Sequence, residues 1–372
     1  MPELMKLMDD WNGYTAMSAV SKGEGYEQAL KETVDLLSNA KGFPAHKHEY
    51  LLREAMTTSD FPYLFGDVLD RQVLASYKAV DPVWKAIVKS STVRDFKTAK
   101  RFAVTGGDQL LAEVAEKGEY LASDRTEDYY ELAAKKYGRQ FDISWETLIN
   151  DTLGALKDTP ERFARAAVRT EHRIVTTLYA RSTTLYSKGA GTHLNLTAGA
   201  LTINYLEEGL EAMAAMTDAN GEPIMNRAKY LVVPPALEMT ARQILTSTSK
   251  MWLGAPAVAA YPTANVVSQM GLTLIVDPYL PVVDTTDGAT GWYLFSDPKD
   301  IAALEVAHLT GHERPEICMK ASDKVTVGGG AIGPMSGDFA TDNVLYRVRL
   351  VFGGITEDWR ATYMGGSTLA AT

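Results

Sequence analysis

The chain has a single cysteine, Cys318, among 372 residues. A framework of disulfide bonds within the chain is therefore excluded, and the composition fits a reducing compartment. There is no apolar run of about 18 residues or more, the minimum for a transmembrane helix. Residues 1–10 lack the basic region and the apolar run of a secretory signal peptide. We expect a protein that is made and kept inside a cell and has no membrane partner.

Positive charge is also scarce. The chain carries 37 Lys and Arg against 47 Asp and Glu, a formal net charge of −10. A dedicated nucleic-acid-binding protein normally has a strong basic excess, so the composition argues against that class but allows a protein that lies beside nucleic acid without adhering to it. Hydrophobic residues make up 46% of the chain, which is enough for two or three domains with cores of their own.

Patterns for cofactors and metals are weak. Residues 328–333 are glycine-rich but lack the Lys-Ser/Thr pair of a phosphate-binding loop, so a surface loop is the better interpretation. Residues 218–221 resemble the start of a calcium loop, but Lys229 stands where the bidentate acid belongs, which predicts a helix-ending turn instead. His308, His312 and Cys318 lie close in sequence, yet zinc requires tighter pairs and a fourth ligand.

Catalytic groupings are equally weak. The chain has no G-x-S-x-G elbow. Cys318, between Ile317 and Met319, is interpreted as a small packed apolar residue. The sequence therefore predicts no catalytic residues, no cofactor and no metal, and it favours a structural protein over an enzyme.

An alternating strand and a very long helix are the most informative patterns present. Over residues 137–145, Phe141, Ile143 and Trp145 alternate with polar residues, which predicts a strand with one apolar face. The helix is predicted to start at residues 159–161, where a capping threonine precedes a proline and an acid, and to end at residue 187. A helix of roughly 28 residues is far longer than the average of about 11–12.

The predicted helix has a thin apolar stripe and a basic face. The stripe consists of Phe163, Ala166, Ala167, Thr170, Ile174, Leu178 and Leu185. The basic face consists of Arg162, Arg165, Arg169, Arg173 and Arg181. This basic face is either solvated, with Glu161 and Glu171 as partial partners, or it contacts acidic groups of a neighbouring subunit. Individual surface charge pairs contribute little free energy, so they do not decide between the two alternatives.

Residues 91–136 carry opposite charge on two limbs. The first limb contains Arg94, Lys97, Lys100 and Arg101. The second contains Glu113, Glu116, Glu119, Asp124, Glu127, Asp128 and Glu131. Turn residues between the limbs predict a long two-stranded hairpin, and isolated hairpins are marginal in water. We expect it to need a partner surface, with charge pairs formed across the strands or with a neighbour.

The remaining segments complete a mixed α+β plan. Residues 1–56 are interpreted as a polar helical arm and residues 57–90 as a helical lead-in. Residues 201–320 alternate helices with apolar strands, as in a compact α/β unit. Residues 344–352 and 356–363 form returning strands, the first of them half-exposed.

This order of parts resembles the major capsid proteins of tailed double-stranded-DNA phages, whose fold is named after phage Hong Kong 97. The resemblance covers about residues 57–365. Its most telling stretches, at residues 57–62, 137–144, 149–151 and the helix from Pro160, are similar to head subunits of the Mu-like group.

The resemblance implies a domain plan. Residues 1–56 would be the N-terminal arm and 91–136 the extended loop that lies across a neighbouring subunit. Residues 137–200, with a spine helix over 159–187, and the return strands in 335–372 would form the peripheral domain. Residues 201–334 would form the axial domain. The candidate inter-subunit contacts are Arg94, Lys97, Lys100, Arg101, Glu113, Glu116, Glu119, Arg165, Arg169 and Arg173.

The resemblance also implies a function. The chain would self-assemble into pentamers and hexamers of an icosahedral head that encloses double-stranded DNA, assembled in the cytoplasm of a host bacterium. Its partners would be copies of itself, portal, scaffolding and decoration proteins, and DNA in loose, non-specific proximity. The short arm favours a separate scaffolding protein. Some members cross-link a lysine of this loop, as Lys97 or Lys100 here, to an asparagine such as Asn343, but no catalytic acid aligns with them.

Two alternatives remain at this point. The first is a nanocompartment shell protein of the same fold, whose subunits resemble a shorter version of this plan. The second is a soluble α/β enzyme built on residues 201–334, with a pocket near His308.

Overall fold

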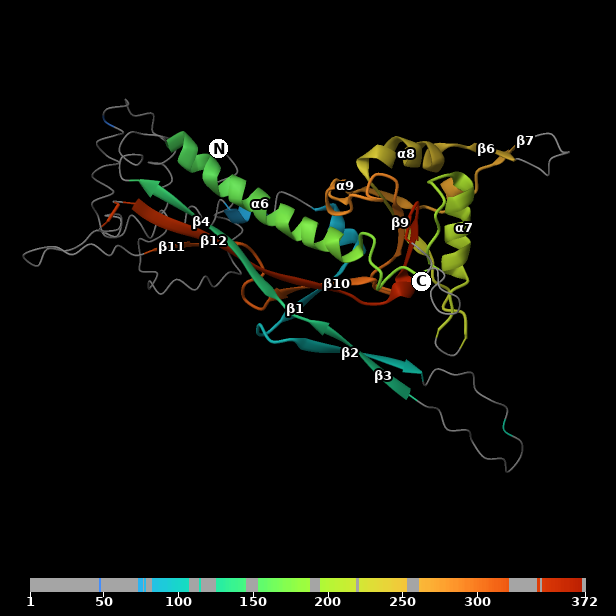
Figure 1. Cartoon of the computed structure of the whole chain (residues 1–372), viewed down its shortest axis with the longest axis horizontal. Helices are drawn as coiled ribbons and strands as arrows, with labels where there is room; N and C mark the ends of the chain where they lie inside the picture. Colours follow the sequence, from blue (N-terminus) through green and yellow to red (C-terminus); the bar gives the residue numbers. More distant parts are fainter. Residues whose placement is uncertain are drawn as a thin grey trace, which may run out of the picture. The chain divides into compact units, whose positions relative to one another are not determined.

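The computed structural model describes residues 82–106, 125–144, 153–187, 195–218, 221–252, 261–320 and 343–369, with isolated positions at 47, 73–75, 77, 114 and 340–341. The predicted arm and most of the helical lead-in lie outside these residues. The chain divides into two compact units, drawn with their elements in Figure 1. The first unit contains residues 1–80, 136–169 and 311–351, and the second contains residues 81–135, 170–310 and 352–372.

A four-stranded sheet forms the centre of the second unit, in the order β13-β9-β5-β8. Its strands are β5 (Ala228–Val233), β8 (Thr273–Val276), β9 (Trp292–Ser296) and β13 (Thr362–Gly365). β5 runs parallel to β8 and antiparallel to β9, and β13 runs antiparallel to β9. The apolar runs of the sequence predicted β5, β8 and β9 as buried strands. The structure confirms all three as strands, but β8 is at the edge of the sheet and only Ile275 in it is buried.

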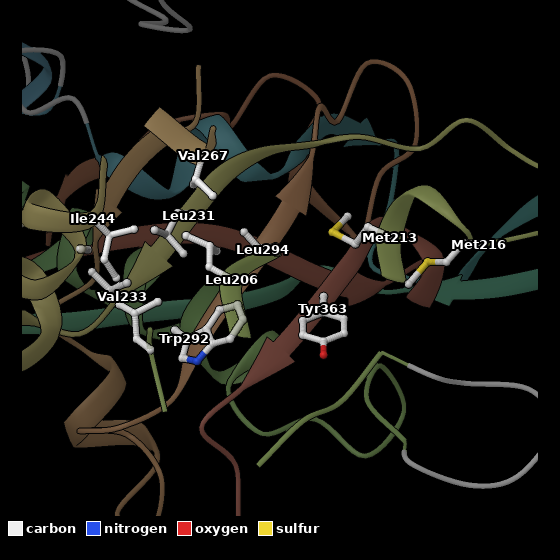
Figure 2. Packing of buried hydrophobic residues seen from close by; sticks show 12 residues of the cluster. Leu206, Met213, Met216, Leu231, Val233, Ile244, Val267, Trp292, Leu294 and Tyr363 are labelled. Atoms are coloured by element: carbon white, nitrogen blue, oxygen red, sulfur yellow. The ribbon is translucent and has the colours of Figure 1, made fainter. Parts of the chain in front are cut away.

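Two helices pack on this sheet, α7 (Ile203–Ala214) and α8 (Glu238–Thr246). Leu206 of α7 and Ile244 of α8 lie in one cluster with Leu231, Trp292 and Tyr363 from the strands, as Figure 2 shows. Short elements complete this part: the hairpin of β6 (Ser249–Trp252) and β7 (Tyr261–Ala264), and the single-turn helix α9 (Leu280–Val283).

Trp292 is the largest of these core side chains and is fully buried. Its Nε1 donates a hydrogen bond to the carbonyl oxygen of Gly199 at 3.1 Å. Its ring lies over Gly365, where an added Cβ would be 2.1 Å from the ring. We expect Trp292→Ala to lower the free energy of unfolding by about 3–5 kcal/mol, through lost apolar burial and the cavity that remains.

Denaturant unfolding of the unassembled chain measures this loss. Met270→Ala is the matched control, because that side chain is 57% exposed and its truncation should change stability by no more than about 0.5 kcal/mol. Equal losses in the two variants would contradict the assigned core.

The second sheet is five-stranded, in the order β1-β10-β12-β11, with β4 also paired to β12. Its strands are β1 (Lys89–Val93), β4 (Lys135–Ser144), β10 (Leu304–Leu309), β11 (Glu316–Met319) and β12 (Asn343–Thr356). β12 pairs with β11 over residues 346–349 and with β10 over residues 352–356. The predicted alternation is confirmed, since Tyr346, Val348 and Leu350 are buried while Arg347 is exposed.

The predicted strand at residues 137–145 is β4. The ring of Phe141 stacks between Phe163, at a centroid distance of 4.7 Å, and Tyr346, at 5.2 Å. Phe141 therefore lies on the apolar face of the strand, as the alternation predicted. The fold is of the α+β class, with helices and a mixed sheet in the described residues.

The long helix is α6, and it spans Leu153–Tyr179. The predicted bounds of 159–187 are wrong at both ends. The helix begins earlier, with Pro160 inside it, where the proline removes one backbone hydrogen bond and crowds the carbonyl of residue 156. Leu, Ala and Lys before Pro160 have high helix propensity, which acts against that cost. It ends earlier because Arg181 adopts a left-handed φ of 51°. Arg181 is held there by Asp287 Oδ2, 3.1 Å from its Nε, and by the hydroxyl of Tyr293.

The predicted apolar stripe is confirmed at Ala167 and Leu185, which are buried, but most of the buried face of the helix lies at other positions. The fully or nearly buried side chains are Ala164, Ala167, Val168, Glu171, His172, Val175, Thr176 and Tyr179. Ala166 is exposed, and Ile174 and Leu178 are half-buried. Thr176 and the Tyr179 hydroxyl donate hydrogen bonds of 2.7 and 2.5 Å to Asp277, so the buried polar groups of the helix have hydrogen-bond partners. A stripe defined by apolar residues alone could not predict a buried helix face that contains polar side chains.

Candidate interaction site on the charged hairpin

The charged hairpin consists of β2 (Ala99–Gly106) and β3 (Arg125–Leu132), drawn in Figure 1. They pair antiparallel, from Ala99 opposite Leu132 to Gly106 opposite Arg125. The predicted two-stranded hairpin is therefore present. Opposite charges face each other across it, since Lys100 pairs in register with Glu131. Lys100 Nζ lies 4.2 Å from the centroid of the Tyr129 ring, a cation–π contact.

The hairpin also exposes aromatic side chains. Phe102 and Tyr129 are directly opposite each other and are 65% and 54% exposed, and Phe96, just before β2, is 54% exposed. The sequence analysis did not predict these exposed aromatic residues, because it considered only the charges of the segment. Their presence among the charged residues of the two strands was the signal that could have indicated an exposed aromatic surface. Exposed aromatic clusters are typical of surfaces that pack against another protein.

The base of the hairpin is fixed by four charged residues, which we call the anchor cluster: Lys89, Arg101, Glu305 and Glu357. Arg101 Nε donates to Glu305 Oε1 at 3.1 Å. Lys89 Nζ lies 3.3 Å from Glu357 Oε1 and 3.9 Å from Glu305 Oε2. The Glu305 side chain is 1% exposed. The contacts connect β2 to β1 and β10, so the exposed part of the hairpin projects from a held base.

Arg101 makes two further contacts with β1. One Nη donates to Ser91 Oγ at 3.3 Å and to the carbonyl oxygen of Thr92 at 3.4 Å. Leu132, at the end of β3, is fully buried. At the base of the hairpin, hydrogen bonds of Arg101 therefore hold β2, and burial of Leu132 holds β3.

The two carboxyl groups of the anchor cluster differ in acidity. Burial opposes ionisation of Glu305, but hydrogen bonds with Glu357 and Ser91 and the charges of Arg101 and Lys89 hold its pKa below the ordinary value. Burial and the hydrogen bond with Glu305 raise the pKa of Glu357 to about 7. With a pKa of about 7, Glu357 keeps its proton in mildly acidic solution, where Glu305 stays ionised.

The raised pKa of Glu357 predicts a pH dependence of stability. The folded-state pKa of Glu357 is about 7 against an ordinary 4.5, so the folded chain binds this proton more tightly than the unfolded chain. The free energy of unfolding should therefore fall by about 3 kcal/mol as pH rises from 4.5 to beyond 7. The lowered pKa of Glu305 acts oppositely, and its contribution is lost as pH falls below 4.5.

Glu357→Gln keeps a donor toward Glu305 and removes the titration. We expect the fall in stability between pH 5 and 8 to flatten in this variant, measured by urea unfolding of the unassembled chain at several pH values. Glu211→Gln, an exposed glutamate of α7, is the control and should leave the profile unchanged. A Glu357→Gln profile that matched the parent would show that Glu357 does not carry the proton.

The other predicted contact residues fall into three groups. Arg94 and Lys97 lie exposed in the bend between β1 and β2. Arg165, Arg169 and Arg173 are exposed on α6. Glu113, Glu116 and Glu119 lie outside the described residues. Contact of these residues with a neighbouring subunit stays a prediction.

One sequence-based pairing is wrong. Glu171, a predicted partner of the basic helix face, is fully buried, and its Oε1 lies 3.4 Å from His308 Nε2. The helical repeat turns residue 171 toward the buried side with Val175, away from the exposed arginines. The exposed arginines of α6 therefore do not pair with Glu171.

The residues considered for a metal are otherwise engaged. His308 faces Glu171, and His312 Nδ1 contacts Glu316. Cys318 is a free, half-buried cysteine on β11. Over the described ranges, no group of three or more His, Cys, Asp or Glu side chains is arranged to hold a metal ion. In the same ranges no helix is long and apolar enough to cross a membrane.

A family model described as phage capsid protein matches residues 129–365, more than half of the chain. The match covers α6 and every strand from β4 to β13, and so both larger sheets except β1. No curated protein matches the sequence.

Solved structures show weaker likenesses. One, from Gordonia phage Cozz, is 14% identical, with 75% of this chain and 84% of that chain covered and a TM-score of 0.46. The capsid structure of cyanophage P-SCSP1u is 11% identical over 77% and 88%, with a TM-score of 0.49. The holo-SrpI encapsulin complex from Synechococcus elongatus PCC 7942 is 11% identical over 77% and 88%, with a TM-score of 0.45. Because these scores are low, the assignment rests on the family match.

Proposed function

The chain belongs to the phage capsid protein family, and from this premise we propose that it is the major subunit of a tailed-phage head, assembling into pentamers and hexamers of an icosahedral shell around double-stranded DNA. Family membership makes it a structural protein of the virion. Within the family, the Mu-like group remains a prediction.

The observation that carries the proposal is the hairpin. Phe102 and Tyr129 expose more than half of their side-chain surface, while the anchor cluster holds the hairpin's base through a 1% exposed glutamate. Aromatic side chains that are held in water on an anchored hairpin contribute little to the stability of a single chain. A neighbouring copy that covers this surface would recover the apolar burial, as obligate interfaces do.

The domain plan is part of the proposal. Residues 91–136 would be the extended loop that crosses to a neighbour, with the described hairpin as its base. Residues 137–200 and 335–372 would form the peripheral domain, and residues 201–334 the axial domain near the five- and sixfold axes. The exposed arginines of α6 would then face neighbouring copies.

The remaining partners follow from the same premise. The net charge of −10 would limit adhesion of DNA to the inner wall, because phosphate attraction grows with the number of cations presented. Portal, scaffolding and decoration proteins are the further partners, and assembly would take place in the cytoplasm of the host bacterium.

Electron microscopy and sedimentation velocity of the purified chain, alone and with co-expressed scaffolding protein, test the proposal. We expect closed, symmetric particles or isolated five- and sixfold rings. A monomer under every condition would refute the shell function. Closed particles that hold a folded cargo enzyme instead of DNA would favour the nanocompartment alternative, and substrate turnover by a monomer would favour the enzyme.

A further inference from the structure

The first unit contains a groove along the pair of strands β4 and β12. It has a volume of about 420 Å³ and is lined by residues 136–140 and 347–349. None of these lining residues is acidic. The stacked rings of Phe141 and Tyr346 mark one face of the strand pair, which packs inward. We call the opposite face, which is open to solvent, the groove face.

Side chains alternate along a strand, so each lining residue can be assigned to one of the two faces. Tyr137 and Arg139 share the face of Phe141 and take no part in the groove face. Buried Val348 shares the face of Tyr346. The other lining side chains lie together on the groove face: Lys136, Gln140, Arg347 and Arg349.

Gly138 shapes the floor of the groove. It lies between Lys136 and Gln140 on the same strand face. A Cβ added to Gly138 would lie 2.6 Å from the carbonyl oxygen of Val348, so a larger residue would force β4 away from β12. Because no side chain rises between Lys136 and Gln140, a ligand can approach the backbone there and reach both of them.

The cations of the groove face are only partly neutralised by the chain itself. Arg349 donates to Glu316 Oε2 at 2.6 Å, and this bond raises the pKa of Arg349. Within the described part of the chain, the exposed side chains of Lys136 and Arg347 form no ion pair. Like charges at one hollow repel one another, and a bound anion would relieve that repulsion.

The composition of the groove face indicates which kind of anion fits. Its side chains are three cations and one amide, with no apolar side chain among them. The centre of a protein–protein interface is apolar and aromatic, and lysine is depleted there, whereas interfaces with nucleic acid are more polar and far more positively charged. Guanidinium groups bind phosphate through two parallel hydrogen bonds, and lysine and glutamine side chains also contact phosphate. The groove face therefore fits a phosphate backbone better than a protein surface.

We infer that the groove face binds phosphates of a nucleic-acid backbone, with Lys136 and Arg347 as the main contacts and Gln140 as a further donor. The inference rests on the proposed shell function, in which double-stranded DNA is the enclosed polyanion. In a chain of net charge −10, most of the surface repels DNA. A local group of cations gives the enclosed DNA a defined place of contact on such a surface.

Fluorescence anisotropy of a short labelled DNA duplex, titrated with the purified full chain at several salt concentrations, tests the inference. Lys136→Gln with Arg347→Gln should lower the affinity by roughly tenfold at low salt and reduce the salt slope of binding by about two, one for each phosphate contact. Arg227→Gln with Lys299→Gln is the matched control, because it makes the same charge change at exposed sites of the second unit. The control should leave the salt slope unchanged.

Glu316→Gln supplies a test of opposite sign. The substitution keeps the size of the side chain but removes the anion that engages Arg349, so a third cation becomes available to phosphate. We expect the affinity for the duplex to rise and the salt slope to steepen by about one. A merely structural role of the groove face predicts no such gain. Circular dichroism spectra and melting curves confirm that each variant is folded.

Competition separates nucleic acid from other anions. Inorganic phosphate should displace the duplex no better than sulfate at the same ionic strength, and poly-glutamate should displace it poorly. Selective displacement by inorganic phosphate would assign the groove face to a small anion. Displacement by poly-glutamate as effective as that by unlabelled duplex would assign it to an acidic protein segment. Either result would overturn the inference.

The outcomes for the groove and for the shell are independent. Equal binding of the duplex by the parent chain and by the variant with Lys136→Gln and Arg347→Gln would overturn the inference and leave the shell function standing. A parent chain that binds the duplex through these residues but forms no particles would overturn the shell function and leave the phosphate site standing.

Discussion

Shortening the charged hairpin is expected to abolish shell assembly while leaving the chain folded. Replacing residues 102–129 by Asn-Gly joins Arg101 to Tyr130, which are directly opposite each other in the ladder. A two-residue Asn-Gly turn fits the twist of such a pair. The variant keeps the contact between Arg101 and Glu305. It removes Phe102, Tyr129 and every acidic residue of the acidic limb, the second limb of the hairpin, except Glu131.

The expected effects on folding and assembly differ in size. The free energy of unfolding of the unassembled chain should change by less than about 1 kcal/mol, because the removed Phe102 and Tyr129 side chains are exposed. Particles should fall below detection by sedimentation velocity and negative-stain microscopy, because each contact between copies loses its docking arm. Normal particles from this variant would refute the docking role.

A milder pair of variants separates the aromatics from the charges. Phe102→Ser with Tyr129→Ser keeps the length and the acidic limb, so any loss of particles measures the apolar contact alone. Met270→Ser is the matched control, since Met270 is 57% exposed in another part of the same unit. Losses of equal size in both would show that general surface polarity, and not the hairpin, governs assembly.

Glu305→Ala is expected to have the largest effect on stability among the residues of the anchor cluster. The side chain is 1% exposed and accepts a hydrogen bond from Arg101, so its removal leaves Arg101 without its anion, whereas Lys89 keeps Glu357. Because the Arg101 side chain is 37% exposed and water screens its charge, the cost should be about 1.5–3 kcal/mol, as for a charged hydrogen bond. The hairpin base should also loosen, so particle yield should fall with stability.

Urea unfolding at pH 7 measures the loss, and a double-mutant cycle assigns it. Arg101→Ala alone should also destabilise the chain, and the double variant should cost clearly less than the sum of the two. Glu131→Ala removes an exposed acid from the hairpin itself and should change stability by no more than about 0.5 kcal/mol. Strictly additive losses would show that Glu305 and Arg101 do not act through one contact.

Local patterns predicted the strands well. The alternation around Phe141 and along residues 344–352 corresponds to β4 and β12, and the apolar runs correspond to β5, β8 and β9. A strand that is buried on one or both faces needs a period of two or a continuous apolar run, and both are visible in the sequence. Residues 218–221 were predicted as a helix-ending turn: Gly221 has a φ of 86° and its N–H donates to the carbonyl oxygen of Asp218, but the preceding helix α7 already ends at Ala214.

The long helix was predicted less well. Its existence followed from a stretch without glycine or proline, but its bounds and buried face did not. Arg181 leaves the helix because Asp287 and Tyr293, more than 100 residues away, bind it there. Glu171, His172 and Thr176 are buried because His308 and Asp277 meet them.

The anchor cluster illustrates the same division. Sequence alone placed Arg101 on a basic limb and predicted a contact with another subunit. Its engagement with Glu305, 204 positions further along the chain, required the parallel pairing of β1 with β10. In the same way, the close approach of Gly138 to Val348 required β4 and β12, roughly two hundred residues apart, to pair.

The amino-acid sequence by itself determined the class of this protein: the absence of disulfides, the acidic net charge, the order of hairpin, strand, long helix and α/β unit, and the resemblance to phage capsid proteins. These follow from composition and from periods that neighbouring residues create. The tertiary structure alone decided which charges are buried and paired, where the long helix ends, and which of its faces is buried. Each of these depends on a partner far away in sequence, because burial and ion pairing are set by the residue that the fold brings opposite.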